Sequence, residues 1–340
     1  MNSERTFFIN NIFNIENENE FQKIALRLFR YQAKENLVYR EFISYLELKP
    51  DEIQSLEEIP FIPIGLFKTH SIISGSDVPT NYFESSGTTG MRLSRNYITD
   101  ISIYEKSLRK GFENVFGNIE EYTIFALVPD LKEKKNSSLI YMIDDWIRRS
   151  REKRIDNKKQ RTDDGYYLND LQNFSETLSR LDSEGRKCIV IGVSSALWDF
   201  SENNSLKLEN TIVIETGGMK GRRVEPVRQE LHQKLKKGFG MKRIHSEYGM
   251  CELFSQAYSR EDGHFFCPPW MKVMIHEIND PFRYCHVNDS GVINIIDLAN
   301  IDSCSFISTM DLGRMSVEGH FEVLGRMDGS DIRGCNLMVI

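Results

Sequence analysis

Residues 82–90 read Tyr-Phe-Glu-Ser-Ser-Gly-Thr-Thr-Gly, and packing explains this stretch less well than any other in the chain. Four hydroxyl residues and two glycines fill the six positions from Ser85 to Gly90. This composition disfavours a helix interior, because Ser and Thr compete with the backbone ladder and Gly costs about 1 kcal/mol relative to Ala. It suits an anion-binding loop, since glycines let backbone N–H groups converge and the hydroxyls add donors. An ordinary Ser/Gly turn is the competing interpretation.

The overall composition is typical of a globular enzyme. The chain has 340 residues, of which 40% are hydrophobic and 27% charged, and this length suits about two domains with a sizeable core. A net charge of −7 argues against a general nucleic-acid binder. We find no run of about 18 apolar residues and no signal-peptide pattern at the N-terminus. We therefore expect no membrane span and a cytoplasmic location.

The cysteines do not form a metal-binding pattern. None of the six is paired as C-x-x-C, which argues against a structural zinc site and favours reduced thiols. His264 and Cys267 are three residues apart, but no second pair completes a ligand set around them.

Alternating apolar segments predict an α/β fold. Strands are expected at 122–128, 187–193 and 211–215, and helices at 138–147, 168–181 and 226–237, which together indicate a mostly parallel sheet sandwiched by helices. Ligands in such sheets bind at the carboxyl ends of the strands. From about residue 270 short strands dominate, at 271–278, 292–296, 305–309 and 320–324, and predict a β-rich subdomain.

The N-terminal part is expected to supply packing helices over 18–58 and an extended apolar segment over 59–68. A helix over 98–116 follows the hydroxyl-rich loop, and its N-terminus would then point at the bound anion.

Three later motifs fit the same chemistry. Glu215-Thr-Gly-Gly-Met-Lys-Gly-Arg222 is a glycine loop after a strand, where Lys220 could face a phosphate or carboxylate; a simple turn is the alternative. Ser246-Glu-Tyr-Gly-Met-Cys-Glu252 offers a ring for base stacking and a hard oxygen ligand for Mg²⁺; a surface Glu near a core Tyr is the alternative. Thr309-Met-Asp-Leu-Gly-Arg314 and Gly325-Arg-Met-Asp-Gly329 supply an Asp for ribose hydroxyls and an Arg for a phosphate.

This ordered set resembles the motifs of the adenylate-forming enzymes, whose patterns are S-[SG]-G-[ST]-T-G, Y-G-x-[TS]-E, T-x-D-L-G and G-R-x-D. Within that superfamily the chain is most similar to the bacterial acyl-protein synthetases, the LuxE family, over roughly residues 20–340. The similarity rests on residues 59–68, 83–90, 246–250, 268–270 and 325–335.

The resemblance implies that ATP and a fatty acid give an acyl-adenylate and pyrophosphate, after which the acyl group passes to a thiol. It assigns the β/γ-phosphates to Ser85, Ser86, Gly87, Thr88, Thr89 and Gly90. It assigns adenine to Gly217, Gly218, Tyr248 and Gly249, Mg²⁺ to Glu252, the ribose to Asp311, and the ribose or α-phosphate to Arg326, with Lys220 as a further catalytic cation.

Cys335 is the residue that the resemblance singles out for the second step. In the family a cysteine near the C-terminus carries the acyl group as a thioester on a mobile arm. A small buried hydrophobic residue is the alternative, because free Cys is often buried.

Two departures from the superfamily pattern matter. The Pro and Lys that usually follow the phosphate loop are replaced by Met91-Arg92-Leu93, so that Arg92 or Arg95 would supply the charge. We also expect the small C-terminal domain with its catalytic lysine to be absent, and divide the chain into a catalytic domain at 1–325 and a tail at 326–340.

The resemblance thus implies an acyl-protein synthetase that uses ATP and Mg²⁺, acts on a fatty or other carboxylic acid, and has an acyl-accepting protein or a reductase as partner. Three alternatives remain open: a phenylacetate-CoA-ligase-like enzyme, an acyltransferase to a sugar or small-metabolite amine or hydroxyl, and a non-catalytic nucleotide-binding subunit.

Overall fold

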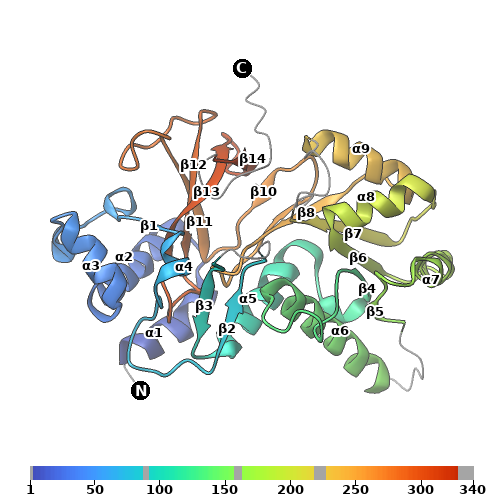
Figure 1. The fold of residues 1–340 in the computed structure, drawn as a ribbon, viewed down its shortest axis with the longest axis horizontal. Helices are drawn as coiled ribbons and strands as arrows, with labels where there is room; N and C mark the ends of the chain where they lie inside the picture. The colour runs from blue at the N-terminus through green and yellow to red at the C-terminus, as the bar shows by residue number, and fades with distance from the viewer. Residues whose placement is uncertain (1–2, 87–91, 157–162, 218–226, 328–340) are drawn as a thin grey trace.

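A computed structural model describes residues 3–86, 92–156, 163–217 and 227–327 of the chain (Figure 1). Its centre is one sheet of twelve strands, in the order β11-β12-β13-β14-β10-β9-β8-β7-β6-β4-β5 with β1 paired to β13. The strands are β1 (Ile62–Pro63), β4 (Thr123–Leu127), β5 (Gly165–Tyr166), β6 (Cys188–Val193), β7 (Thr211–Thr216), β8 (His245–Tyr248), β9 (Ala257–Ser259), β10 (Phe265–Phe266), β11 (Met271–His276), β12 (Ser290–Asp297), β13 (Phe306–Met315) and β14 (Phe321–Arg326).

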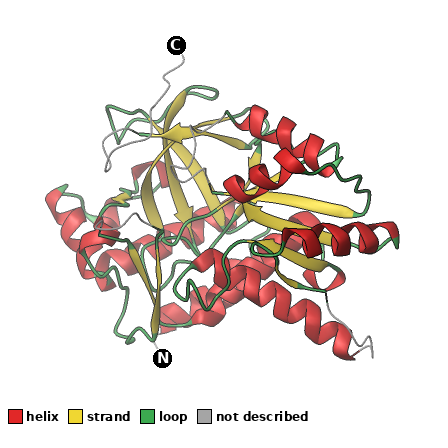
Figure 2. Ribbon diagram, turned by 45° about the vertical axis from the view of Figure 1, so that its right-hand side comes forward, coloured by secondary structure: helices red, strands yellow, loops and turns green. Residues whose placement is uncertain are grey.

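The half of the sheet from β5 to β8 is parallel and is covered by helices on both faces (Figure 2). Alternate side chains of β4, β6 and β7 enter two separate apolar clusters. One cluster includes α5 (Ile101–Phe116) and α6 (Ser138–Asp156), and the other includes α7 (Leu171–Ser183), α8 (Ser194–Asn203) and α9 (Arg228–Phe239). Burial on both faces explains why these strands read as continuous apolar runs.

The other half, from β9 to β14, is antiparallel and packs against the N-terminal helices. Phe29 of α2 contacts Phe306 of β13 at a ring-centroid distance of 5.9 Å, and Tyr39 of α3 stacks on the same ring at 6.1 Å. The helices here are α1 (Ser3–Asn11), α2 (Glu18–Glu35), α3 (Leu37–Tyr45) and α4 (Leu66–Thr69), with short 3-10 turns at Ile12–Asn14, Pro50–Glu52, Leu56–Glu58 and, before β4, Ile119–Glu121.

The strands on either side of the hydroxyl-rich loop form a separate β-hairpin. Strands β2 (Asn81–Glu84) and β3 (Arg95–Ile98) pair in antiparallel fashion, with Glu84 opposite Arg95. The expected helix after the loop begins only at Ile101, where the side chain of Asp100 accepts a hydrogen bond from the Ser102 N–H. The prediction that this helix points its N-terminus at the loop is therefore wrong, because β3 lies between them.

The α/β fold class is confirmed, with helices on both faces of a largely parallel half-sheet. The β-rich segment predicted from about residue 270 exists, but its strands continue the same sheet. Helix α1 was not expected, and α6 runs nine residues beyond the predicted end at residue 147, to Asp156. The division at residues 325 and 326 stays a prediction. Among the described helices, none combines the length and the apolar character needed to cross a membrane.

A buried carboxylate joins the two halves of the molecule. Asp297, at the end of β12, is fully buried, and its Oδ2 accepts the backbone N–H groups of Phe254 (2.8 Å) and Ser255 (2.9 Å). Its Oδ1 accepts the Ser255 hydroxyl (2.6 Å) and the Ala299 N–H (3.0 Å). Burial raises the pKa of Asp297 to about 6, although the hydrogen-bond donors oppose this rise. Because this pKa lies below 7, the carboxyl group is mostly ionised at neutral pH.

Neighbouring side chains extend this network to both sides. Trp270 Nε1 donates to the hydroxyls of Ser255 (2.9 Å) and of Ser107 in α5 (3.0 Å). Asn300 donates from Nδ2 to the backbone carbonyl of Glu252 (2.8 Å), and Gln32 of α2 donates to the backbone carbonyl of Asn300 (2.8 Å). The segment from Glu252 to Ser255 is thus tied to β12, α2 and α5 at once.

We predict that Asp297→Asn lowers the free energy of unfolding by about 2 to 3 kcal/mol, because both carboxylate oxygens accept N–H donors and an amide NH₂ would face at least one of them. Urea denaturation at pH 7 measures the loss. The matched control is Asp289→Asn, at an exposed aspartate, which should change stability by less than about 0.5 kcal/mol. Equal stabilities of the two variants would contradict the role given to Asp297.

Candidate functional site

The predicted site residues gather where the carboxyl ends of β7 and β8 meet β13 and β14. Residues 248–252 leave β8 and run across this region. Tyr248 begins the segment and contacts Asp311 of β13, whereas Cys251 and Glu252 end it beside the base of the hydroxyl-rich loop. Carboxyl ends of parallel strands are the usual ligand sites of α/β folds.

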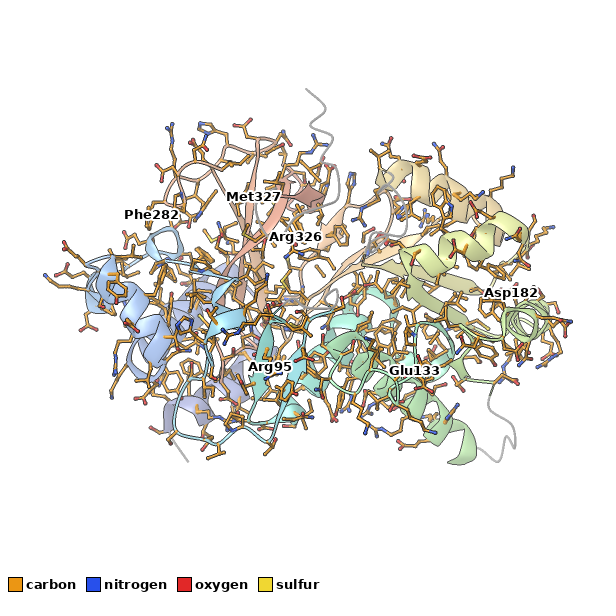
Figure 3. All side chains as sticks on the ribbon, viewed as in Figure 1. Arg95, Glu133, Asp182, Phe282, Arg326 and Met327 are labelled. Carbon is orange, nitrogen blue, oxygen red and sulfur yellow. The ribbon has the colours of Figure 1, made fainter. Side chains whose placement is uncertain are left out.

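Tyr248, Asp311 and Arg326 form the first group. The Tyr248 hydroxyl donates to Oδ2 of Asp311 (2.8 Å), and Nε of Arg326 lies 3.7 Å from Oδ1 of the same carboxylate. Asp311 and Arg326 are cross-strand partners between β13 and β14. The Arg326 side chain is 64% exposed, at the end of β14 (Figure 3), so it can reorient toward a ligand.

Burial sets the ionisation of this group. It raises the pKa of Tyr248 well above its ordinary value, and the adjacent Asp311 carboxylate raises it further, so that the phenol stays protonated as a donor. Burial also raises the pKa of Asp311, partly offset by Arg326 and by the Tyr248 hydrogen bond. The ring of Tyr248 packs edge-on against Phe265 and Phe321 at 5.9 and 5.5 Å, which leaves little of it open for stacking.

The base of the hydroxyl-rich loop forms the second group. Ser85 and Ser94 close the loop, since the Ser94 N–H donates to Ser85 Oγ and the Ser85 N–H donates to the Ser94 carbonyl, both at 3.0 Å. Ser85 is half-buried and Ser86 exposed. The thiol of Cys251 lies 3.8 Å from the Ser94 carbonyl oxygen and also hydrogen-bonds the Glu252 side chain.

Glu252 is the candidate Mg²⁺ ligand, and its surroundings suit a cation. The residue is 4% exposed, and in the described part of the chain no Lys, Arg or His forms an ion pair with it. A buried carboxylate needs a positive partner or several donors. Burial raises the pKa of the adjacent Cys251 far above its usual range, with Glu252 adding to the shift, so the thiol stays neutral.

Of the glycines predicted to bind ATP, the structure describes Gly217 and Gly249, and their surroundings differ. Gly217 follows β7 with φ +67°, in the left-handed region that favours glycine, and no atom of the described residues lies within 4 Å of where its Cβ would be. That open space suits a flat ligand group. A Cβ at Gly249 would instead lie too close to Oε1 of Glu247, so a side chain there requires the buried Glu247 carboxylate to move.

Two buried glutamates at this edge of the sheet were not predicted. Glu215 of β7 accepts hydrogen bonds from Arg228 Nη1 and Ser194 Oγ, both at 2.7 Å, and lies 3.5 Å from His232 Nε2. Burial alone would raise the pKa of Glu215, but His232, Arg228 and two hydroxyls lower it below the ordinary value. Ser194 Oγ also lies 2.9 Å from the Gly217 carbonyl oxygen. Ser194 therefore connects the Glu215–Arg228 ion pair to the start of the glycine loop.

Glu247 of β8 is the second buried glutamate. It faces the opposite side of the sheet, is 7% exposed, and hydrogen-bonds the Thr216 hydroxyl. Burial raises the pKa of Glu247 to about 7, and the nearby Glu215 charge adds to the rise. The burial of these two glutamates could not be predicted from the strand sequences, because it depends on packing against helices α5, α8 and α9.

A polar cavity of about 450 Å³ opens beside the hairpin. Its lining is Lys68, Thr69, His70, Ser71, Glu84, Arg92, Leu93, Arg95 and Tyr97. Arg92 and Arg95, predicted to replace the motif lysine, both line it. Arg95 (labelled in Figure 3) forms an ion pair with Glu84 at 2.9 Å. The remaining predicted residues lie outside the described part of the chain: Gly87, Thr88, Thr89, Gly90, Gly218, Lys220 and Cys335.

Comparison with solved structures identifies the fold class of the chain. The chain aligns with 2-hydroxyisobutyryl-CoA ligase in complex with 2-HIB-AMP at a TM-score of 0.64 and 14% identity, over 94% of this chain and 71% of the ligase. It aligns with ATP-bound MatB from Rhodopseudomonas palustris at a TM-score of 0.51 and 15% identity, over 74% of this chain and 49% of MatB. The fold is that of the adenylate-forming enzymes, and the chain spans about half the length of MatB.

The family follows from the sequence. The family model described as "Acyl-protein synthetase, LuxE" matches residues 11–340, so the chain belongs to the LuxE acyl-protein synthetase family. Among curated proteins, none matches the sequence.

We predict that Glu247→Gln flattens the pH dependence of stability. A carboxyl whose pKa is raised from 4.5 to about 7 on folding favours the folded state at low pH, and this contribution is lost as pH rises through 7. The wild type should therefore lose about 2 kcal/mol more than the variant between pH 5 and pH 8. Urea denaturation at both pH values gives the comparison, and identical pH profiles would show that Glu247 ionises normally.

Proposed function

We propose that this protein is an ATP-dependent acyl-protein synthetase, which activates a fatty acid as its adenylate and transfers the acyl group to a thiol. Membership of the LuxE family and the adenylate-forming fold support the coarser class, an ATP-binding acyl ligase. One observation carries the proposal. The tyrosine that hydrogen-bonds Asp311 and the candidate metal ligand Glu252 lie at the two ends of one short segment, residues 248–252, at the carboxyl end of β8.

The first group of residues would hold the nucleoside. The Asp311 carboxylate, oriented by the Tyr248 hydroxyl, has the geometry to accept ribose hydroxyls. Arg326 lies beside the same carboxylate and is exposed enough to reach a phosphate. Gly217, with Gly218 and Gly249, would lie against adenine, and the open space at Gly217 fits a planar group.

The second group would hold the triphosphate. Ser85 and Ser86 begin the loop whose remaining residues, Gly87 to Gly90, complete the proposed phosphate site. Glu252 would hold Mg²⁺, since it is buried near this loop without a described cationic partner. When bound, the ion would neutralise phosphate charge. Lys220, together with Arg92 or Arg95, would add positive charge near the phosphates.

The proposed first step forms one bond and breaks one. A carboxylate oxygen of the acid attacks the α-phosphorus of ATP, and the bond to the pyrophosphate oxygen breaks, so that acyl-adenylate and pyrophosphate result. The protein contributes position and charge complementarity: Asp311 fixes the ribose, and Arg326 stabilises negative charge that develops at the α-phosphate.

The proposed second step moves the acyl group to sulfur. The thiolate attacks the acyl carbonyl carbon, the mixed anhydride bond breaks, and AMP leaves. We assign the thiol to Cys335, on the sequence resemblance alone. Burial raises the pKa of the described thiols of Cys251, Cys267 and Cys304, which makes each a poorer nucleophile at neutral pH. A cytoplasmic location and an acyl-accepting protein or reductase complete the proposal.

We predict that the protein catalyses carboxylate-dependent ATP–pyrophosphate exchange in the presence of Mg²⁺, with long-chain acids preferred to short or aromatic acids. Glu252→Gln keeps the buried volume but removes the charge, and should slow exchange by about 100-fold. The matched control, Glu209→Ala at an exposed position, should exchange at the wild-type rate. Tight ATP binding with no exchange for any acid would overturn the ligase assignment and favour a nucleotide-binding subunit.

We predict that incubation with ATP, Mg²⁺ and the preferred acid adds one acyl mass to the chain, and that hydroxylamine removes it. Cys335→Ala should abolish the adduct yet retain pyrophosphate exchange, because adenylation precedes the transfer. Cys285→Ser, at a half-buried cysteine, is the control and should still be acylated. Intact-protein mass spectrometry reads both outcomes, and an unchanged adduct in Cys335→Ala would place the thioester elsewhere.

A further inference from the structure

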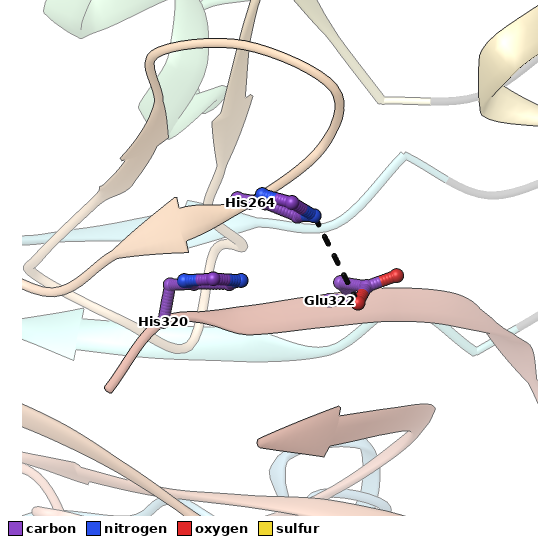
Figure 4. A group of neighbouring side chains, drawn as sticks. All are labelled: His264, His320 and Glu322. Carbon is purple, nitrogen blue, oxygen red and sulfur yellow. Dashed lines mark ion pairs between the residues drawn. The ribbon is translucent and has the colours of Figure 1, made fainter. Parts of the chain in front are cut away.

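We propose that His264, His320 and Glu322 form a binding site for one divalent transition-metal ion of the zinc class. The proposal is independent of the ligase activity. Within the described residues these three side chains are the group whose ligand atoms gather closely enough to hold a metal, all within 4.8 Å of one another (Figure 4).

Strand register brings the three residues onto one face. In the antiparallel pair of β10 and β14, Phe265 lies opposite Phe321. The same register places His264 opposite Glu322, and His320 precedes Glu322 by two residues, so its side chain points to the same side. The stacked imidazoles of His264 and His320 have a centroid distance of 4.1 Å and an interplanar angle of 22°.

The ligand set matches zinc-class chemistry. Two imidazole nitrogens and one carboxylate oxygen are common ligands of Zn²⁺, and a tetrahedral site with bonds of about 2.0–2.1 Å separates its ligand atoms by about 3.3 Å. His264 Nε2 and Glu322 Oε1 are 4.0 Å apart, so small side-chain rotations would close the site. His264 is 42% exposed and Glu322 24%, which leaves a route for the ion and room for a water ligand.

Neighbouring residues hold two of the ligands in place. Arg314 donates to both oxygens of Glu322 at 3.0 Å, which orients the carboxylate and leaves lone pairs for a metal. Nδ1 of His320 lies 3.9 Å from the Glu318 carboxylate, close enough for a small rotation to bring the two into hydrogen-bond distance. Carboxylates behind ligating histidines are typical of metal sites.

This site differs in kind from the candidate ligand Glu252. Mg²⁺ prefers oxygen ligands, whereas imidazoles select borderline transition metals. Cys267, three residues after His264, is not among the clustered ligands. On the opposite face of β10 and β14, Phe265 and Phe321 pack against Tyr248. A bound ion would therefore join the two strands that support this tyrosine.

The test is isothermal titration of tag-free, chelator-treated protein with ZnCl₂, with MgCl₂ as a parallel titrant. We expect one Zn²⁺ per chain and no comparable Mg²⁺ binding at this site. His264→Ala and Glu322→Gln should each weaken Zn²⁺ binding by at least about 10-fold. His286→Ala, at an exposed histidine elsewhere, should bind as the wild type does.

Co²⁺ substitution identifies the ligands independently. We expect visible d–d bands that His264→Ala removes, without the near-ultraviolet charge-transfer band that a thiolate ligand would produce. Because His264 is substantially exposed, its replacement leaves the core intact, and circular dichroism checks this. Absence of Zn²⁺ binding in the wild type, equal affinity in all four proteins, or a thiolate band would each overturn the proposal.

Discussion

Four hydrogen-bond donors converge on the buried carboxylate of Asp297, and the arrangement of the candidate site depends on them. Two of these donors are the backbone N–H groups of Phe254 and Ser255, directly after the segment that carries Tyr248 and Glu252. A buried carboxylate is costly unless its lone pairs are satisfied, so the native geometry of this turn is strongly favoured over alternatives. Asn300 adds a hydrogen bond to the Glu252 carbonyl, which holds Glu252 from the same turn.

The consequence is that one short segment serves both halves of the sheet. Tyr248 ends the last parallel strand and reaches Asp311 in the antiparallel half. Four residues later Glu252 lies next to the base of the hydroxyl-rich loop, at the loop end of the β2–β3 hairpin. The proposed nucleoside and phosphate positions are therefore held at a fixed spacing by the backbone itself. A second group of hydrogen bonds holds Gly217 from the other face of the sheet, through Ser194 and the Glu215–Arg228 ion pair.

Sequence patterns predicted the features that depend on local sequence, such as strands buried on both faces. Continuous apolar runs located β4, β6 and β7. Three of the motif residues, Tyr248, Asp311 and Arg326, lie together in the structure, and their roles stay predictions. Patterns failed where tertiary partners decide. Strands β9 and β10 are too short to show alternation, and β3 was not predicted, although its last residue, Ile98, was taken as the start of the following helix. The same limit hid Glu215 and Glu247, whose burial comes from distant helices, and the cluster of His264 with His320, which only strand register brings together.

The most direct test of the central claim is a crystal structure of the chain with Mg²⁺ and a non-hydrolysable ATP analogue. We expect ribose hydroxyls on the Asp311 carboxylate, adenine beside Gly217, and the metal on Glu252 with the triphosphate at the base of the hairpin loop next to Ser85. A nucleotide bound elsewhere, for example wholly within the cavity lined by Lys68 and Arg92, or a Glu252 carboxylate that makes no contact with the metal, would contradict it.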